Sequence, residues 1–193
     1  MRQFLYFKKG FTLIELMVTM AVAAVLLMVA APGVVSFQRN SEMTSITNSL
    51  LSAINAARAE AMKTGLNAMV VPADGKNWSS GLIVFVDKDR DNVYTENSDV
   101  LVLEREAMPS YITISGTGNA NSANPYIMFN GSGYAKSYGL PAGVANLTLT
   151  IARNDIVAAQ ANAEMRRIVV ALTGRVRSCR PSNDSSCTPN SVG

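Results

Sequence analysis

The chain has 193 residues, of which 48% are hydrophobic and 16% are charged, and this length is enough for one domain with a core and an appendage. Its formal net charge of +3 is unevenly distributed: the body is close to neutral, with an acidic stretch over 87–106 and a basic end from Arg166 onward. Histidine is absent, which excludes the usual serine and cysteine triads and zinc sites that use histidine.

The first predicted element is an apolar helix over residues 11–31, in which Glu15 is the only charged side chain. Such a helix spans about 31 Å, close to the thickness of a bilayer core. Lys8 and Lys9 precede it, which favours a cytoplasmic amino end with the rest of the chain outside. A secretory signal peptide is the alternative, but Pro32 follows instead of a cleavage site and the pattern continues as an amphipathic helix. The sequence therefore predicts a transmembrane segment.

Glu15 needs its own explanation. A carboxylate inside an apolar span costs about 2.5–3.5 kcal/mol at the centre, less near an end, and indicates a function. It lies one helical turn from Phe11, so a cut after Gly10 would create an amine on Phe11 close to it. That amine could also come from a neighbouring copy inside a bundle of helices.

The segment Lys9–Leu16 reads KGFTLIEL and resembles, at every position, the prepilin cleavage motif of type IV pilins and type II secretion pseudopilins. The resemblance implies that residues 1–10 are a leader, removed between Gly10 and Phe11 by the prepilin peptidase, with methylation of the new amine. It also implies that Glu15 pairs with the amino terminus of a neighbouring pilin, major or minor, during assembly.

Helical periodicity continues beyond the apolar span. Pro32-Gly33 removes a backbone bond and predicts a kink. Apolar residues then recur at three- and four-residue steps, and Thr64-Gly65 indicates the end of the helix. We expect one helix over 11–64, with its first half in lipid or in a filament core and its second half packed on a sheet. The second half would contact the sheet through an apolar stripe that serves core packing, formed by Ile46, Leu50, Ile54, Ala57 and Ala61.

Residues 65–193 change to short β-type runs separated by turn residues. This spacing favours a small antiparallel sandwich or twisted sheets, and hence an α+β fold with the long helix against a β head. The predicted strands are Ala68–Val71, Leu82–Val86, Val100–Leu103, Tyr111–Ser115, Tyr126–Phe129, Leu147–Ala152 and Arg167–Thr173.

Three places resemble the GspH/FimT family of minor pilins and pseudopilins. They are the helix end Ala57–Lys63, the stretch Trp78–Asp87, in which Leu82 replaces the family's usual aromatic residue, and Gly174–Arg177. The resemblance implies the type IV pilin fold, in which a long amino-terminal helix packs on an antiparallel β head.

Acidic residues alternate over Asp87–Asn92, as they do in a calcium loop. An EF-hand would have glycine in place of Asn92 and glutamate in place of Ser98. The sequence therefore favours a solvated loop held by its own Asp and Asn side chains, with calcium as the alternative and no metal site expected.

Cys179 and Cys187 are the only cysteines. Outside the inner membrane, oxidising conditions favour a disulfide between them, worth about 2–3 kcal/mol by chain entropy. A redox role is the alternative, although the spacing is not C-x-x-C.

The basic end suggests a ligand. In an extended segment Arg175 and Arg177 project to the same side, Arg180 follows in the disulfide loop, and Arg166-Arg167 open the preceding strand. Guanidinium groups contact phosphates without regard to base sequence. The Gly-Arg-x-Arg end also resembles that of a family branch implicated in binding DNA during natural transformation. The alternative is that these arginines solvate an edge strand or pair with acids of a neighbouring pilin.

Together these patterns predict a minor pilin of a type IV pilus that helps to initiate assembly, sits at or near the tip, and binds double-stranded DNA for uptake. A minor pseudopilin of type II secretion and a purely structural subunit are the alternatives. We expect no enzymatic activity and no cofactor. The expected location is the inner membrane with a periplasmic head, and afterwards the extracellular fibre.

Overall fold

The computed structural model describes residues 10–138, 146–157 and 161–191, and for residues 29–32 the backbone alone. The chain divides into two compact units, Met1–Ser41 and Glu42–Gly193. All but the last residue of the predicted leader 1–10 therefore lies outside the described residues.

The first unit contains the beginning of helix α1 (Leu13–Thr64). The helix begins two residues later than predicted because Thr12 caps it: its Oγ1 accepts a hydrogen bond from the amide of Glu15 at 3.2 Å. The large apolar side chains from Phe11 to Phe37 that the structure describes as exposed have between 47% and 78% of their surface accessible. Among the described residues, this unit therefore presents an exposed apolar surface.

Among the described residues, no single helix is long and apolar enough to cross a membrane. The two parts Leu13–Met28 and Gly33–Thr64 meet the length and composition criteria when taken together, with 42° between them. The break includes Pro32, where the sequence predicts a kink.

In the second unit, α1 carries the predicted apolar stripe. Leu50, Ile54, Ala57 and Ala61 are buried, while Ile46 is half-buried. The helix ends at the predicted residue because Gly65 takes a left-handed backbone (φ 71°) and its amide donates to the carbonyl of Ala61 at 2.9 Å.

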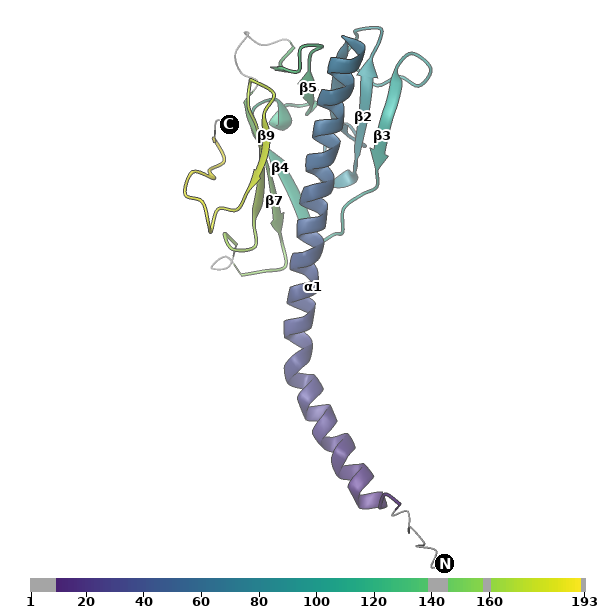
Figure 1. Cartoon of the computed structure of the whole chain (residues 1–193), viewed down its shortest axis with the longest axis vertical. Coiled ribbons are helices and arrows are strands. Elements are labelled where there is room, and N and C mark those ends of the chain that lie inside the picture. The colour runs from purple at the N-terminus through teal and green to yellow at the C-terminus, as the bar shows by residue number, and fades with distance from the viewer. Residues whose placement is uncertain (1–9, 139–145, 158–160, 192–193) are drawn as a thin grey trace, which may run out of the picture. The chain divides into compact units, whose positions relative to one another are not determined.

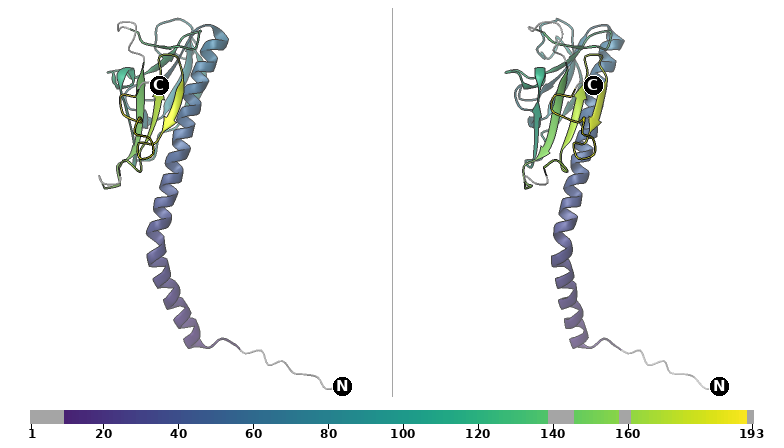
Figure 2. Two further views of the ribbon diagram at one scale, coloured as in Figure 1. Left: turned by 60° about the vertical axis from the view of Figure 1, so that its left-hand side comes forward. Right: turned by 90° about the vertical axis from the view of Figure 1, so that its left-hand side faces the viewer.

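Two antiparallel sheets pack against this half of the helix. Figure 1 shows β2 and β3 on one side of it and β4, β7 and β9 on the other, and the turned views of Figure 2 place the strands of both sheets on the same side of the helix. The first sheet has the order β3-β2-β1-β5-β6 and the second β4-β7-β8-β9. The strands are β1 (Asn67–Pro72), β2 (Leu82–Asp87), β3 (Val100–Arg105), β4 (Ile112–Gly116), β5 (Ile127–Phe129), β6 (Ala135–Lys136), β7 (Leu147–Arg153), β8 (Arg166–Val170) and β9 (Val176–Cys179).

The main core lies between the helix and the inner faces of both sheets. Val70 and Val84 face it from the first sheet, and Leu149 and Ile168 face it from the second. Along each strand the alternate residues point to the opposite, outer face. The α+β fold predicted from the sequence, a long helix packed on an antiparallel β head, is confirmed.

The predicted strands match the observed ones to within a few residues, but two strands were not predicted. β6 has only two residues, and β9 exists because it pairs with β8. The strand predicted over Arg167–Thr173 stops at Val170 because the next residues form a hairpin turn, in which the amide of Ala171 donates to the carbonyl of Arg175.

Candidate functional site

The predicted processing junction is exposed. Phe11 has 77% of its surface accessible, and no heavy atom lies within 4 Å of the position that a Cβ on Gly10 would take. Glu15 is exposed in the first turn of α1, where the partial positive charge of the helix terminus favours a carboxylate. The junction is therefore sterically open to a peptidase.

The helix end Ala57–Lys63, one of the family-like segments, has a structural role. The Nε of Arg58 donates to the carbonyl of Gly133 at 2.9 Å, which ties the helix to the turn between β5 and β6. Nearby, Gly174 has φ 80°, and a Cβ on it would come within 1.8 Å of the same Gly133 carbonyl oxygen. The glycine of the Gly-Arg-x-Arg segment is thus required by the contact between two hairpin turns.

The second family-like segment, Trp78–Asp87, is also structural at its start. Trp78 is buried and its indole Nε1 donates to the carbonyl of Ala120 at 2.9 Å. Gly81 has φ 104°, and a Cβ there would lie 2.3 Å from the carbonyl oxygen of Arg105. No side chain larger than glycine's fits between β2 and the end of β3 at this point.

The acidic loop after β2 is closed by its own carboxylates. Asp87 is fully buried and accepts hydrogen bonds from the amides of Arg90 (2.8 Å) and Asn92 (3.3 Å). Burial raises the pKa of Asp87, against the lowering effect of these two amides. Asp99, which the sequence analysis did not single out, accepts from the amides of Lys88 (3.0 Å) and Thr95 (2.9 Å). The loop is held as the sequence predicts.

Oxygens of Asp87, Asp89 and Asp99 lie within 4.8 Å of one another. Because two of these carboxylates already accept backbone hydrogen bonds within the loop, their geometry is explained without an ion. Calcium binding at this loop stays an untested alternative.

The two cysteines, Cys179 at the end of β9 and Cys187, are joined by a disulfide with a Cα–Cα distance of 5.9 Å. The segment that follows packs on the outer face of the second sheet. Cys187 and Ser191 are buried, and the hydroxyl of Thr117 donates to the carbonyl of Pro189 at 3.4 Å. We call residues 180–191 the carboxyl-terminal tail.

The arginines of the basic end have different environments. Arg175 is exposed, and Arg177 and Arg180 are half-buried. Ala171 and Arg175 continue the pairing of β8 and β9, so Arg175 and Arg177 project from the same, outer face as predicted.

Arg177 is not a free cation. Its Nη1 lies 3.4 Å from Oδ2 of Asp184 in the carboxyl-terminal tail. Hydrogen bonds from the hydroxyl and amide of Ser186, and then the charge of Arg177, lower the pKa of Asp184. The pairing with an acid of the same chain was not foreseen, because Asp184 is the only acid in this stretch and no spacing rule points to it.

Two further arginines, which the sequence groups with the basic end, are buried and therefore not available to a ligand. Arg166 and Arg167 are 6% and 8% exposed. The guanidinium of Arg167 donates to the carbonyl of Cys187 and, from Nε, to Oγ1 of Thr150 at 3.3 Å, and burial lowers its pKa. Arg167 therefore holds the tail rather than a ligand.

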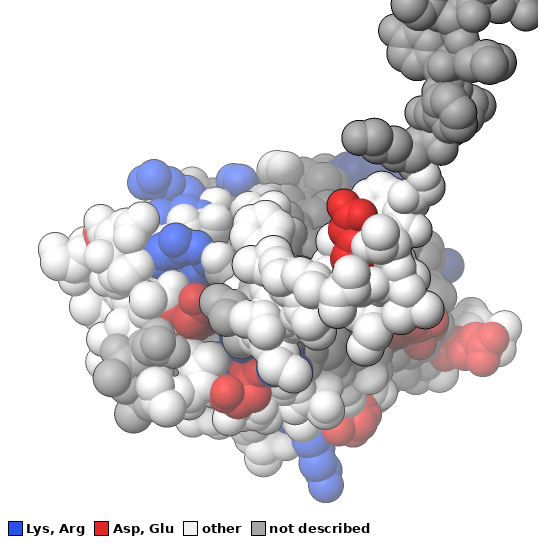
Figure 3. Space-filling model, turned by 90° about the horizontal axis from the view of Figure 1, so that it is seen from below, with Lys and Arg blue, Asp and Glu red and all other residues white. Residues whose placement is uncertain are grey.

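Figure 3 shows one face of the molecule, on which Lys and Arg side chains are interspersed with acidic ones. The basic end is a small mixed patch rather than a continuous positive surface. Its accessible cations are Arg175 and, in part, Arg177 and Arg180.

Two family models match the sequence. The model described as type II transport protein GspH matches residues 47–174, and the model described as the prokaryotic N-terminal methylation motif matches residues 7–31. A search of curated protein sequences finds no match.

Solved structures share the fold. The type IV minor pilin FimU of Pseudomonas aeruginosa superposes with a TM-score of 0.53 at 16% identity, over 76% of this chain and 94% of FimU. The minor pseudopilin EpsH from the type 2 secretion system of Vibrio cholerae superposes with a TM-score of 0.49 at 13% identity, over 72% of this chain and 98% of EpsH. Escherichia coli GspH superposes with a TM-score of 0.49 at 10% identity, over 74% of this chain and 90% of GspH. At these identities the likeness concerns the fold.

Proposed function

The chain belongs to the GspH family of minor pilins and pseudopilins, and from that membership we propose that it is a minor pilin of a type IV pilus that helps to start assembly at or near the tip. It is a structural subunit of a type IV pilus or of a type II secretion system, and not an enzyme. The observation that carries the proposal is the methylation motif over 7–31, which includes the start of α1, where the apolar side chains are exposed.

The prepilin peptidase would cut between Gly10 and Phe11, and the exposed junction supports this. The apolar segment 11–31 would then anchor the subunit in the inner membrane, with Lys8 and Lys9 having kept the amino end in the cytoplasm. The β head would face the periplasm until the subunit enters the fibre.

Glu15 would pair with the Phe11 ammonium of a neighbouring pilin. In an apolar bundle a carboxylate needs such a partner, because an unpaired charge is costly there. Glu15→Gln keeps the shape of the side chain and removes its charge, so we expect incorporation into fibres to fall.

The matched control for this test is Glu60→Gln, which removes a carboxylate of the same helix that is paired with Lys63 at 3.1 Å. This change is expected to leave incorporation unaltered. Equal incorporation of the Glu15 and Glu60 variants would refute the role of Glu15.

A deletion strain separates the pilus from the secretion system. Loss of surface pili with normal secretion would favour the type IV pilus. The shared fold of FimU, which is itself a type IV minor pilin, supports the same assignment. Normal pili with failed export of secreted proteins would instead favour a minor pseudopilin.

We further propose sequence-independent contact of Arg175, Arg177 and Arg180 with double-stranded DNA during natural transformation. The exposed position of Arg175 and the shared face of Arg175 and Arg177 support this. The Asp184–Arg177 pair weakens it, since a phosphate would have to displace a carboxylate. We therefore expect weak binding that depends on few charges.

The test is a titration of the full chain, in a zwitterionic detergent, with double-stranded DNA at several salt concentrations. If three arginines neutralise three phosphates, a plot of the logarithm of the association constant against the logarithm of the salt concentration should have a slope of about −3. The double variant Arg175→Ala/Arg177→Ala should lose most of the affinity.

Arg105→Ala is the control, because Arg105 is an exposed arginine on β3 in the other sheet. If the double variant bound DNA as tightly as the Arg105 variant, the DNA proposal would be wrong while the pilin assignment would stand. A deletion strain that makes pili but does not transform would support DNA uptake as the subunit's task.

A further inference from the structure

The outer face of the first sheet, on the side opposite the helix, carries a second hydrophobic cluster that the pilin assignment does not use. Met69, Phe85, Tyr126 and Met128 are buried there. They alternate along their strands with the residues that face the main core, and Met69 is paired with both Phe85 and Met128. This face has its own packing, although no helix in the part of the chain that the structure describes covers it.

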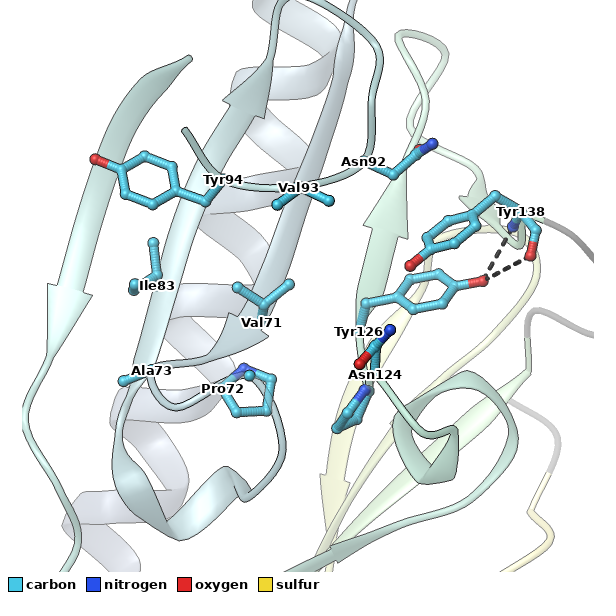
Figure 4. Close-up of a pocket in the computed structure, with 12 residues that line it drawn as sticks. Val71, Pro72, Ala73, Ile83, Asn92, Val93, Tyr94, Asn124, Tyr126 and Tyr138 are labelled. Carbon is cyan, nitrogen blue, oxygen red and sulfur yellow. Dashed lines mark hydrogen bonds between the residues drawn. The ribbon is translucent and has the colours of Figure 1, made fainter. Parts of the chain in front are cut away.

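A groove with a volume of about 380 Å³ opens beside this cluster. Figure 4 shows Tyr94 and Ile83 on one side of the groove, Val71 in the middle, and Tyr126 and Tyr138 on the other side. We call it the tyrosine groove. Its volume lies within the range of sites that bind small molecules.

The wall formed by Tyr126 and Tyr138 is pre-organised. The two rings stack with centroids 4.2 Å apart and 19° between their planes. The Tyr126 hydroxyl oxygen accepts a hydrogen bond from the amide of Tyr138 at 3.0 Å. On the other side, the ring of Tyr94 packs against the ring of Phe85, with their centroids 5.4 Å apart. Both walls are therefore fixed by contacts that exist without a ligand.

The polar groups of the groove are neutral. Asn92 and Asn124 line it, and in Figure 4 they lie on either side of the stacked tyrosine pair. None of the described residues that line the groove is an acid or a base other than tyrosine, and burial raises the pKa of Tyr138. Tyr126 is 4% exposed, whereas Tyr94 and Tyr138 are half-buried, so the site offers the rings and hydroxyl groups of Tyr94 and Tyr138 together with the two side-chain amides, and no charge.

This chemistry selects among ligand classes. A phosphate or nucleic acid needs cations, which the lining does not supply. An added peptide strand needs a free sheet edge, whereas the groove lies on the face of β1 and β2, both of which are interior to their sheet. A sugar ring presents an apolar C–H face to an aromatic ring and hydroxyl groups around its rim to amides. We propose that the tyrosine groove binds an uncharged saccharide.

The test is isothermal titration of the full chain with two uncharged probes, cellotetraose and chitotetraose. The protein is held in a zwitterionic detergent, because detergents with sugar headgroups would compete. We expect saturable binding of at least one probe with a Kd of about 1 mM or tighter. Tyr94→Leu, which keeps apolar volume against Phe85, and Asn124→Ala, at an exposed position, should each weaken binding by about tenfold or more.

Tyr134→Ala is the control, because Tyr134 is 51% exposed and does not line the groove. A sulfated oligosaccharide and a proline-rich peptide are the competing probes. Absence of saturable binding of both uncharged probes would overturn the proposal, as would stronger binding of the sulfated sugar or the peptide, or equal affinity in the Tyr94, Asn124 and Tyr134 variants. None of these results would bear on the pilin assignment.

Discussion

At the scale of single residues, the arginines of the basic end show what composition can and cannot predict. The number of arginines and the alternation of their side chains along the strand could be predicted from the sequence, but the burial of Arg167 could not. β8 is buried along its whole length: Ile168 and Val170 face the core, and on the other face Arg167 contacts the carbonyl of Cys187 in the carboxyl-terminal tail. A pattern of alternation cannot reveal a cover supplied by a distant polar segment.

Arg167→Met tests this structural role, since it keeps an unbranched apolar stem and removes the guanidinium donors. The carbonyl of Cys187 then loses its partner, so we expect the amides of Thr188 and Ser191 to exchange with solvent about tenfold faster. Hydrogen-exchange mass spectrometry measures this. Arg175→Met should leave the exchange unchanged, and equal rates in all three proteins would show that Arg167 does not hold the tail.

Gly174 gives a second test at this scale. Gly174→Ala places a Cβ 1.8 Å from the Gly133 carbonyl oxygen in addition to the left-handed backbone strain, whereas Gly75 has a similar φ of 73° with nothing within 4 Å. Gly75→Ala should therefore cost about 1–2 kcal/mol, and Gly174→Ala at least about 2 kcal/mol more. Denaturant unfolding of the two variants gives the difference, and equal losses would mean that the two turns are not in close contact.

The pH dependence of the tail follows from Asp184. Because the pKa of Asp184 is lowered in the folded chain, its contribution to stability is complete above 3.8, the usual value, and is lost as the pH falls through the lowered pKa. Thermal unfolding between neutral and strongly acidic pH should show this loss in the wild type. In Asp184→Asn, the decrease in stability at acidic pH should be smaller, because the contribution of the ionised Asp184 is already absent. Parallel curves for the two proteins would contradict the Asp184–Arg177 and Asp184–Ser186 contacts.

At the scale of elements, local signals were sufficient wherever an element is set by its own sequence. The helix end at Thr64, the apolar stripe and seven strands follow from glycine, periodicity and β-branched runs. β6 and β9 were missed because each is defined by its partner strand: β9 reads Val-Arg-Ser-Cys and carries little strand propensity of its own. The tyrosine groove was missed for a related reason, since its residues come from five separate segments.

The disulfide is the testable link between β9 and the tail. Reduction should lower the free energy of unfolding by about 2–3 kcal/mol, through the loop that Cys179 and Cys187 close. Guanidinium unfolding with and without reductant measures this. The double variant Cys179→Ser/Cys187→Ser should already be destabilised and should not respond to reductant. An unchanged wild-type midpoint under reduction would show that the disulfide does not stabilise the head.

At the scale of the whole molecule, the two units differ in what the sequence can specify. The head Glu42–Gly193 has a core of its own, so its strands and packing follow from its residues. The helix before it exposes apolar side chains that the described residues leave uncovered, and in the proposed function the membrane and other subunits cover them. For this reason the amino-terminal motif, rather than any cavity, carries the functional assignment.

The central claim is that the chain is trimmed after Gly10 and then joins a fibre through its exposed helix. Mass spectrometry of the protein recovered from sheared surface fibres tests it most directly. The expected polypeptide begins with N-methylated phenylalanine at position 11 and lacks residues 1–10. Recovery only from the membrane, with Met1 and the leader still attached, would contradict it.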